Sequence, residues 1–231
     1  MEIFMKIGIF TDSHYATDAA HAAGYERLKG ALDAFSEAGC ALAVFLGDLT
    51  DKEKTHAEEI ASLERLRALF ERYSFPVFVM FGNHDIVNFS KEEFYEILGE
   101  HHRPKNGDFC GCNLIFLDTC CFQDGRDYRK GNGNWQQIYV PRLDALREAL
   151  KNASDAPAYA FAHFPLDPDA TPWRRVHNAD AVMKILEESG KFRAVFQGHD
   201  HRRIESKIGG IRYATYEALL DTEDAFFIEE I

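Results

Sequence analysis

The chain has 231 residues, of which 46% are hydrophobic and 28% charged, and its formal net charge is -12. This length and composition predict one globular domain with a substantial core, spanning residues 1–231. An acidic surface repels DNA and RNA, which argues against general nucleic-acid binding and leaves small, metal-neutralised phosphate substrates as candidates.

The cysteines and the apolar segments bear on the cellular compartment. The five cysteines are odd in number in a chain that is not small, which favours reduced thiols in the cytoplasm over a disulfide framework. The pairs CGC and CC lack the spacer that is typical of zinc sites. The start, MEIFMKIGIF, carries Glu2 and Lys6 and predicts a first strand instead of a signal peptide. No run is long enough to cross a membrane, so we expect a cytoplasmic protein without a membrane partner.

Strand and helix patterns alternate along most of the chain. Short apolar runs predict buried strands over 5–10, 40–47, 75–82, 112–120, 156–165 and 191–198. Amphipathic patterns predict helices over 25–39, 56–73, 90–99, 141–153 and 178–190, with Ser90 capping the third and Pro141 starting the fourth. This alternation predicts parallel β–α units and an α/β fold. The last 30 residues predict antiparallel hairpin strands, with a turn at Gly209-Gly210.

Residues of metal-ligand type follow five of these strands. The motifs are TDSH, GDLTD, GNHD, AHFP and GHDH, and they contain Asp12, His14, Asp48, Asp51, Asn83, His84, Asp85, His163, His199 and His201. The carboxyl ends of strands in α/β sheets form a ligand crevice, so these side chains should converge. Each motif alone is weak, because a histidine after a strand usually faces solvent and Gly-Asp is a common turn. The remaining histidines, at 21, 56, 101, 102 and 177, are expected to be solvated.

The order of these motifs resembles the calcineurin-like metallophosphoesterase superfamily, whose pattern is D-x-H, G-D-x-x-D, G-N-H-D/E, a later His and G-H-x-H. The match runs from residue 7 to about 202. The resemblance implies a four-layer sandwich in which two central mixed β-sheets are flanked by helices. Asp51 is followed by KEK, where the serine/threonine phosphatases have Arg-Gly. The chain is most similar to the compact bacterial-type branch, with its cyclic-nucleotide phosphodiesterases and ADP-ribose/CDP-alcohol diphosphatases.

The resemblance implies a dinuclear metal centre. One metal would be held by Asp12, His14, Asp48 and His201, and the other by Asp48, Asn83, His163 and His199. Asp48 would therefore bridge the two ions. Mixed imidazole, carboxylate and amide ligands suit manganese, iron or zinc and disfavour calcium. Gly198 would let the backbone approach closely, and Asp200 is expected to lie behind the ligands or to face solvent.

The implied reaction is hydrolysis of a phosphodiester, a nucleotide pyrophosphate or a phosphomonoester by a metal-bridging hydroxide. His84 would protonate the leaving oxygen, and Asp85 would orient and help charge its imidazole. Asp51 is expected to orient a ligand or hold its loop. The alternative is a non-catalytic metal-binding scaffold of the same fold, which predicts damaged motifs, whereas His84 and every ligand are present here.

Substrate choice is expected to depend on the polar segment that precedes the fourth motif. The segment contains Arg126, Arg129, Lys130 and Trp135. The arginines could bind a second phosphate, and Trp135 could stack on a base or close the pocket. A solvated hairpin without such a role is an equal alternative. Further candidates for the rim of the site are Tyr15, Trp173, Arg174 and Arg175. We expect a small phosphorylated substrate, with nucleotides among the candidates.

Overall fold

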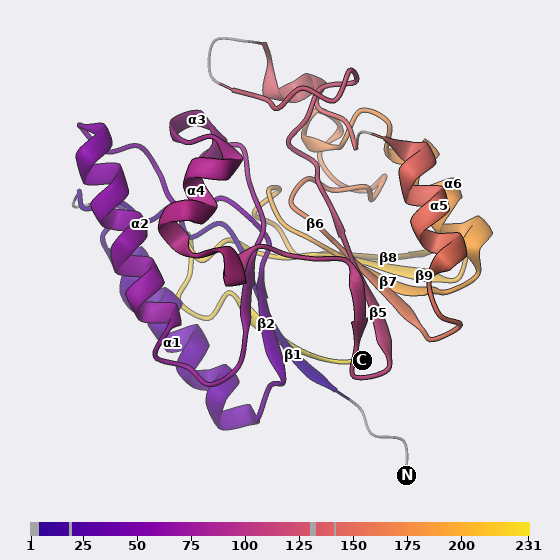
Figure 1. Cartoon of the computed structure of the whole chain (residues 1–231), viewed down its shortest axis with the longest axis horizontal. Helices are drawn as coiled ribbons and strands as arrows, with labels where there is room; N and C mark the ends of the chain where they lie inside the picture. The colour runs from indigo at the N-terminus through magenta and orange to yellow at the C-terminus, as the bar shows by residue number, and fades with distance from the viewer. Residues whose placement is uncertain (1–4, 19, 130–132, 141) are drawn as a thin grey trace.

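The computed structural model describes residues 5–18, 20–129, 133–140 and 142–231, and Figure 1 shows two β-sheets with helices on their outer faces. The first sheet has the order β10-β1-β2-β3. Its strands are β1 (Lys6–Phe10), β2 (Leu42–Phe45), β3 (Val77–Val79) and β10 (Phe226–Glu230). The first three run parallel, and β10 runs antiparallel to β1.

The second sheet has the order β4-β5-β6-β7-β9-β8. Its strands are β4 (Gly107–Phe109), β5 (Cys112–Leu117), β6 (Ala158–Ala162), β7 (Phe192–Gln197), β8 (Ile204–Ile208) and β9 (Ile211–Thr215). The strands β5, β6, β7 and β9 are parallel, and the short edge strands β4 and β8 are antiparallel to their neighbours. Both sheets are therefore mixed, as the family resemblance implies.

The two sheets pack face to face through an apolar layer. Ile7 and Val44 of the first sheet share one buried cluster with Leu114, Phe161 and Phe196 of the second. The outer faces carry the helices α1 (Ala23–Ala38), α2 (His56–Phe70) and α4 (Lys91–Leu98) on the first sheet, and α5 (Leu143–Asn152) and α6 (Ala179–Ser189) on the second (Figure 1). The four-layer fold is confirmed.

Local signals at the helix ends act as the sequence predicts. The Ser90 side chain accepts a hydrogen bond from the Glu93 N–H at 3.1 Å and begins α4. Gly190 ends α6 in the left-handed conformation, with φ at 68°. Pro141, the predicted first residue of the fourth helix, lies outside the described residues, and α5 begins at Leu143.

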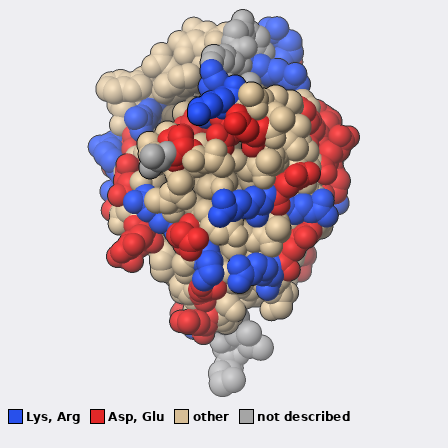
Figure 2. Space-filling model, turned by 90° about the vertical axis from the view of Figure 1, so that its left-hand side faces the viewer, with Lys and Arg blue, Asp and Glu red and all other residues tan. Residues whose placement is uncertain are grey.

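On the side of the molecule that carries α1 and α2, basic and acidic side chains are interspersed (Figure 2).

The C-terminal strands differ from the prediction. The hairpin of β8 and β9 forms around Gly209 and Gly210 as expected, but β9 also pairs in parallel with β7. The strand β10 makes no second hairpin and instead joins the other sheet beside β1. A pairing between residues more than 200 positions apart leaves no turn motif in the sequence, which explains the error. His102 was also wrongly expected to be solvated, because it is buried with Nδ1 2.8 Å from the Val77 carbonyl oxygen.

The cysteines are all free thiols. Cys121 Sγ lies near two carboxylates, those of Asp118 and Asp127, but Lys91 Nζ stands among them at 3.3 Å from the sulfur and 2.6 Å from each carboxylate. The ammonium group of Lys91 thus supplies a hydrogen-bond donor and a positive charge to both carboxylates and the sulfur. Within the described residues, no helix combines the length and the apolar character that crossing a bilayer requires.

Candidate metal centre

The predicted ligands lie on loops that follow strands of both sheets. β1 leads into Asp12, β2 into Asp48, β3 into Asn83, β6 into His163 and β7 into His199. Hydrogen bonds between backbones fasten these loops to one another. Asp12 N–H donates to the Gly47 carbonyl and Gly198 N–H to the His163 carbonyl, both at 3.0 Å. The backbone thus brings the five strand ends to one centre.

Five of the predicted ligands adopt a left-handed backbone conformation. They are Asp12, His14, Asp48, His199 and His201, with φ between 44° and 64°. Each such residue costs about 1–3 kcal/mol, and clusters of them mark functional sites. The sharp turns let neighbouring side chains, such as those of His199 and His201, reach different parts of the centre.

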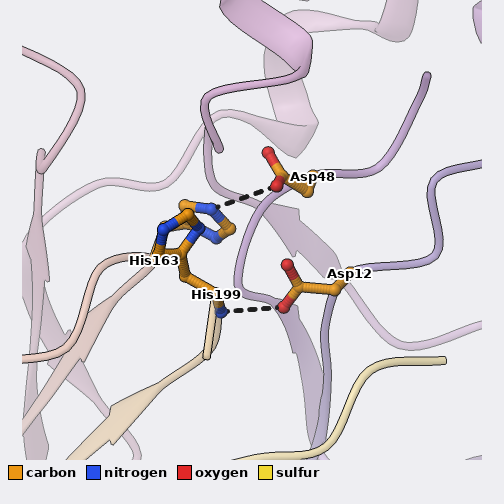
Figure 3. Close-up of side chains that lie close together, drawn as sticks. All are labelled: Asp12, Asp48, His163 and His199. Atoms are coloured by element: carbon orange, nitrogen blue, oxygen red, sulfur yellow. Dashed lines mark hydrogen bonds and ion pairs between the residues drawn. The ribbon is translucent and has the colours of Figure 1, made fainter. Parts of the chain in front are cut away.

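Four buried side chains form one part of the site (Figure 3). The ligand atoms of Asp12, Asp48, His163 and His199 all lie within 4.8 Å of one another. His163 Nε2 is 3.4 Å from Asp48 Oδ2 and also 3.4 Å from Asn83 Oδ1. Asn83, the predicted amide ligand, therefore joins this group.

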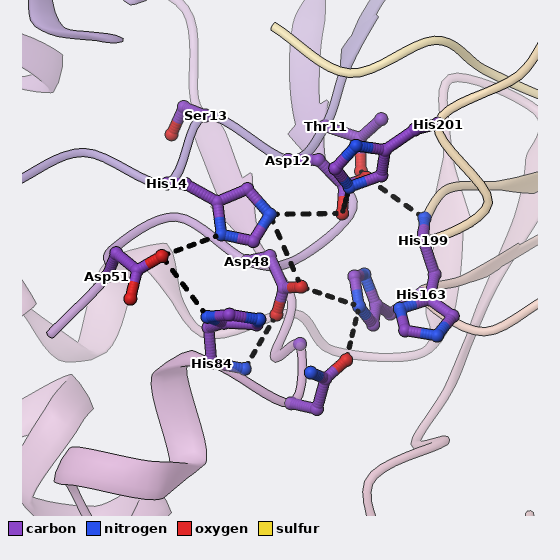
Figure 4. Close-up of polar contacts among 12 residues, drawn as sticks. Thr11, Asp12, Ser13, His14, Asp48, Asp51, His84, His163, His199 and His201 are labelled. Atoms are coloured by element: carbon purple, nitrogen blue, oxygen red, sulfur yellow. Dashed lines mark hydrogen bonds and ion pairs between the residues drawn. The ribbon is translucent and has the colours of Figure 1, made fainter. Parts of the chain in front are cut away.

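A second group shares Asp12 with the first. The ligand atoms of Asp12, His14 and His201 also lie within 4.8 Å of one another. His201 Nε2 is 3.4 Å from Asp12 Oδ1, and His14 Nε2 is 3.6 Å from Asp48 Oδ2 (Figure 4). Asp48 thus lies beside an imidazole of each group. The structure brings all seven predicted ligands together.

These side chains suit metal ions. Asp12 Oδ1, His14 Nε2, His163 Nδ1 and His199 Nε2 are buried and make no hydrogen bond with any described residue. Buried polar atoms are normally paired, and leaving them unpaired is costly. Coordination of a cation would satisfy them, and the mixture of imidazole, carboxylate and amide donors suits manganese, iron or zinc.

Two glycines permit the close packing of the loops. A Cβ on Gly198 would lie 2.8 Å from Asp12 Oδ2 and would also collide with the Thr11 side chain. A Cβ on Gly82 would overlap the Asp48 carboxylate. The motifs therefore need glycine beside the carboxylates, as expected for Gly198.

Burial and neighbouring groups shift the pKa values of the buried side chains. Burial opposes the ionisation of Asp48, but His163 and the other nearby imidazoles hold the pKa of this carboxyl well below its usual range. Burial, together with the neighbouring His163, lowers the pKa of His199 to about 3. The His199 ring also packs against Phe164 and Trp135, with ring centroids 4.0 and 5.1 Å away. His199 is therefore neutral, which is the form of histidine that binds a metal.

His84 lies at the more open edge of the centre. Its Nδ1 is 3.3 Å from Asp51 Oδ2, and the same oxygen is 3.4 Å from Nδ1 of His14. The His84 side chain is 40% exposed, whereas that of His14 is 5% exposed. Burial would lower the pKa of His84, but Asp51 and Asp48 raise it above the ordinary value. His84 can therefore hold a proton beside the ligands and still reach solvent.

Asp85 does not make the contact that the sequence predicted. Its buried carboxylate accepts hydrogen bonds from the N–H groups of Thr50 and Gly82, both at 2.9 Å. Burial and the charge of Asp48 raise its pKa to about 6. Asp85 begins the short helix α3 (Asp85–Asn88) and fastens the loop that carries Asp48 to the loop that carries Asn83. Asp51 takes the place beside His84.

Asp221 is a contributor that the sequence did not indicate. Its Oδ2 lies 3.1 Å from His201 Nδ1, so it orients the Nε2 atom of that ring toward Asp12. The N–H groups of Leu219 and Leu220 donate to the carbonyls of Thr11 and Asp12, which holds this segment at the site. Asp221 follows the last strand of the second sheet, far from every motif, and no pattern marks it.

Asp200 lies behind the ligands. Its side chain is buried and accepts hydrogen bonds from Thr171 N–H at 3.0 Å and from Arg202 at 2.7 Å. Arg174 Nη1 donates to the carbonyl of His199 at 2.9 Å, which keeps Arg174 at the rim of the site. Asp200 therefore lies behind the ligands, which was one of the two expectations, and does not face solvent.

The other rim candidates divide into two sets. Trp173 is exposed, and Trp135 lies against His199. Tyr15 is buried and hydrogen-bonded to Arg65, and Arg175 donates to the Leu166 carbonyl, so both serve the packing of the fold. Arg126 and Arg129 are exposed on the segment that precedes Trp135, where Arg126 pairs with Asp124 at 2.7 Å. Lys130 lies outside the described residues.

Comparison with known proteins agrees with the fold and the cluster. The family model described as calcineurin-like phosphoesterase matches residues 5–203. The chain therefore belongs to the calcineurin-like phosphoesterase family. As such it is a metal-dependent phosphoesterase.

Two sequence relatives extend over most of the chain. A manganese-dependent ADP-ribose/CDP-alcohol diphosphatase from Arabidopsis thaliana is 22% identical and aligns with 94% of this chain and 86% of its own length. A probable cyclic nucleotide phosphodiesterase from Rhodopseudomonas palustris is 26% identical, with 90% and 76% covered. A dimetal phosphatase from Danio rerio has a similar structure, with a TM-score of 0.80, 17% identity, and 98% of this chain and 92% of that chain covered. This last likeness concerns the fold alone.

Proposed function

We propose that the chain hydrolyses a phosphoester bond in a small substrate, with two metal ions held by the predicted ligands. The observation that carries this proposal is the convergence of ligand side chains from five loops, three of which carry buried, unpaired ligand atoms, beside the partly exposed His84. Two bound cations would supply a water molecule of lowered pKa and positive charge for the phosphoryl oxygens.

The ligand sets are those of the family pattern. Asp12, His14 and His201 would hold one ion together with Asp48, and Asn83, His163 and His199 would hold the other, also with Asp48. The position of Asp48 Oδ2, 3.6 Å from His14 Nε2 and 3.4 Å from His163 Nε2, supports its bridging role. Manganese, iron and zinc all suit this donor set.

His84 is the proton donor of the proposed reaction. Its Nδ1 faces Asp51, which leaves Nε2 as the atom that delivers a proton to the leaving oxygen. Asp51 replaces Asp85 in the role of orienting and charging this ring. Asp85 acts as a support for the loops. His14 Nδ1 lies 3.4 Å from the same Asp51 carboxylate, which would direct its own Nε2 to a metal ion.

A nucleotide-containing substrate is favoured by the names of the two sequence relatives, a diphosphatase for ADP-ribose and CDP-alcohols and a probable cyclic nucleotide phosphodiesterase. Diesters and pyrophosphates are therefore the first substrates to test, with monoesters next. The protein would act as one domain, and its five free thiols favour the reducing cytoplasm.

The proposal is tested on protein that has been stripped of metal and reconstituted with manganese. We expect hydrolysis of bis(p-nitrophenyl) phosphate that rises with Mn²⁺ and is abolished by a strong chelator. A panel of cyclic nucleotides, nucleotide diphosphate conjugates and monoesters then identifies the preferred bond. Two bound metal ions per chain with no turnover of any compound would refute the proposal and support the scaffold alternative.

A further inference from the structure

A cavity of about 580 Å³ lies against the segment that joins β5 to α5. This volume falls within the range of about 300–1,000 Å³ that small-molecule sites occupy. Its wall includes Phe122, Gln123, Arg126, Gln137, Tyr139 and His177. In Figure 1 the segment lies above the strands, at the top of the view.

Two of the segments that line the cavity also contact His199 at the metal centre. Gln137 belongs to a single turn of 3-10 helix, Trp135–Gln137, and the Trp135 ring lies 5.1 Å from the ring of His199. His177 follows Arg174 in the chain, and Arg174 donates to the His199 carbonyl. The segments that line the cavity are thus the same segments that contact His199 through Trp135 and Arg174.

The wall is held in place by backbone hydrogen bonds. Tyr139 N–H donates to the Cys121 carbonyl at 2.7 Å, and His177 N–H donates to the Ile138 carbonyl at 2.9 Å. The rings of Tyr139 and His177 consequently lie side by side, with centroids 5.0 Å apart. These contacts place two aromatic rings on one wall of the cavity.

The side chains around the cavity match the chemistry of a nucleobase. Phe122, Tyr139 and His177 offer flat surfaces on which a base can stack. The amides of Gln123 and Gln137 supply both donors and acceptors, which the edge of a base requires. Arg126 adds a cation at the same wall, although it is shared with Asp124.

We propose that this cavity binds the nucleobase of a nucleotide substrate while the phosphate lies at the metal centre. This inference rests on the proposed function and names the substrate class of the same site. Tyr139, His177 and Phe122 are then specificity-determining residues.

The test compares two kinds of substrate that share one leaving group. The p-nitrophenyl esters of thymidine 5′-phosphate and adenosine 5′-phosphate carry a nucleoside, and methyl p-nitrophenyl phosphate carries none. We expect Tyr139→Ala to lower kcat/KM for the nucleoside esters by about tenfold, the effect of losing one stacked ring, and to leave the methyl ester unchanged. Tyr139→Phe keeps the ring and should restore the preference. His177→Ala, at an exposed position, repeats the test where Tyr139→Ala fails to fold.

Gln136→Ala is the matched control. Gln136 lies in the same turn as Gln137, but it bonds to Asn134 Nδ2 at 3.1 Å and does not line the cavity. This variant should retain the preference for nucleoside esters. Wild-type protein that shows no such preference, or variants that lose both activities equally, would overturn the inference, while hydrolysis of the methyl ester would still uphold the proposed function.

If none of the three esters is hydrolysed, a binding measurement tests the inference. AMP and TMP are titrated into the wild-type protein and the two variants Tyr139→Ala and Gln136→Ala, and binding is followed by calorimetry. Weaker binding by Tyr139→Ala alone supports a nucleobase site. Equal affinities for all three proteins, or no binding to any, contradict it.

Discussion

The two ends of the metal centre shift the pKa of a histidine side chain in opposite directions. At one end His84 is partly exposed, and Asp51 raises its pKa. At the other end His199 is buried against Phe164 and Trp135, and its pKa falls to about 3. The surroundings of each ring therefore suit one histidine to the proposed role of proton donor and the other to that of metal ligand, although each lies in a short motif that begins with glycine.

The two sheets supply different kinds of residue to the centre. The loops of the first sheet carry the carboxylates Asp12, Asp48 and Asp51, so histidines on that side gain negative neighbours. The loops of the second sheet carry His163 and His199 beside aromatic side chains. Neither sheet alone offers a full set of ligands, so the centre exists only where the two sheets meet.

The largest effect is expected from Asp48, which joins the two ends. Asp48→Asn removes a charge that faces His14, His163 and the backbone N–H of His84. We expect loss of both metal ions, measured by elemental analysis after reconstitution, and activity at the background level. Asp33→Asn is the control, because Asp33 pairs with Lys29 on the surface of α1. Retention of two ions by the Asp48 variant would contradict the bridge.

The second-largest loss of activity is expected from a change at His84. His84→Asn should lower kcat by about 10²- to 10⁴-fold for a substrate with an alkyl leaving group, because general acid catalysis contributes that much. The loss should be smaller for p-nitrophenyl esters, since p-nitrophenolate departs without a proton. His56→Asn, on α2, should change neither rate. A variant that loses metal ions, or loses both rates equally, would show that His84 is not the donor.

Asp51→Asn should reduce kcat by about 10- to 100-fold for the alkyl leaving group. Asp51 raises the pKa of His84, and the donor must be protonated, so activity is lost as the pH rises through this pKa. Removing the charge lowers the pKa of His84, and the alkaline loss of activity should therefore move to lower pH. An unchanged pH profile would mean that Asp51 does not act through His84.

Much of the centre could be predicted because its ligands follow strand ends in ordered motifs. The seven ligand candidates and His84 needed only the apolar runs and the family pattern. The partner of His84 could not be predicted, because Asp51 and Asp85 are both acidic residues of the motifs and only the folded structure shows which of them lies beside the ring. Asp221 was missed since its contact with His201 depends on the path of the chain after β9. The placement of β10 was missed because its pairing is long-range.

The smallest effect on catalysis is expected from Asp85, which the sequence paired with His84. In Asp85→Asn an amide group replaces one carboxylate oxygen and leaves the N–H of Thr50 or of Gly82 without its acceptor. We expect a loss of about 1–3 kcal/mol in the free energy of unfolding, measured by urea denaturation of the reconstituted protein. The difference between alkyl and p-nitrophenyl leaving groups should stay that of the wild type, because the Asp51–His84 pair is untouched. If this difference instead changes as it does in Asp51→Asn, then Asp85 and not Asp51 charges the ring of His84.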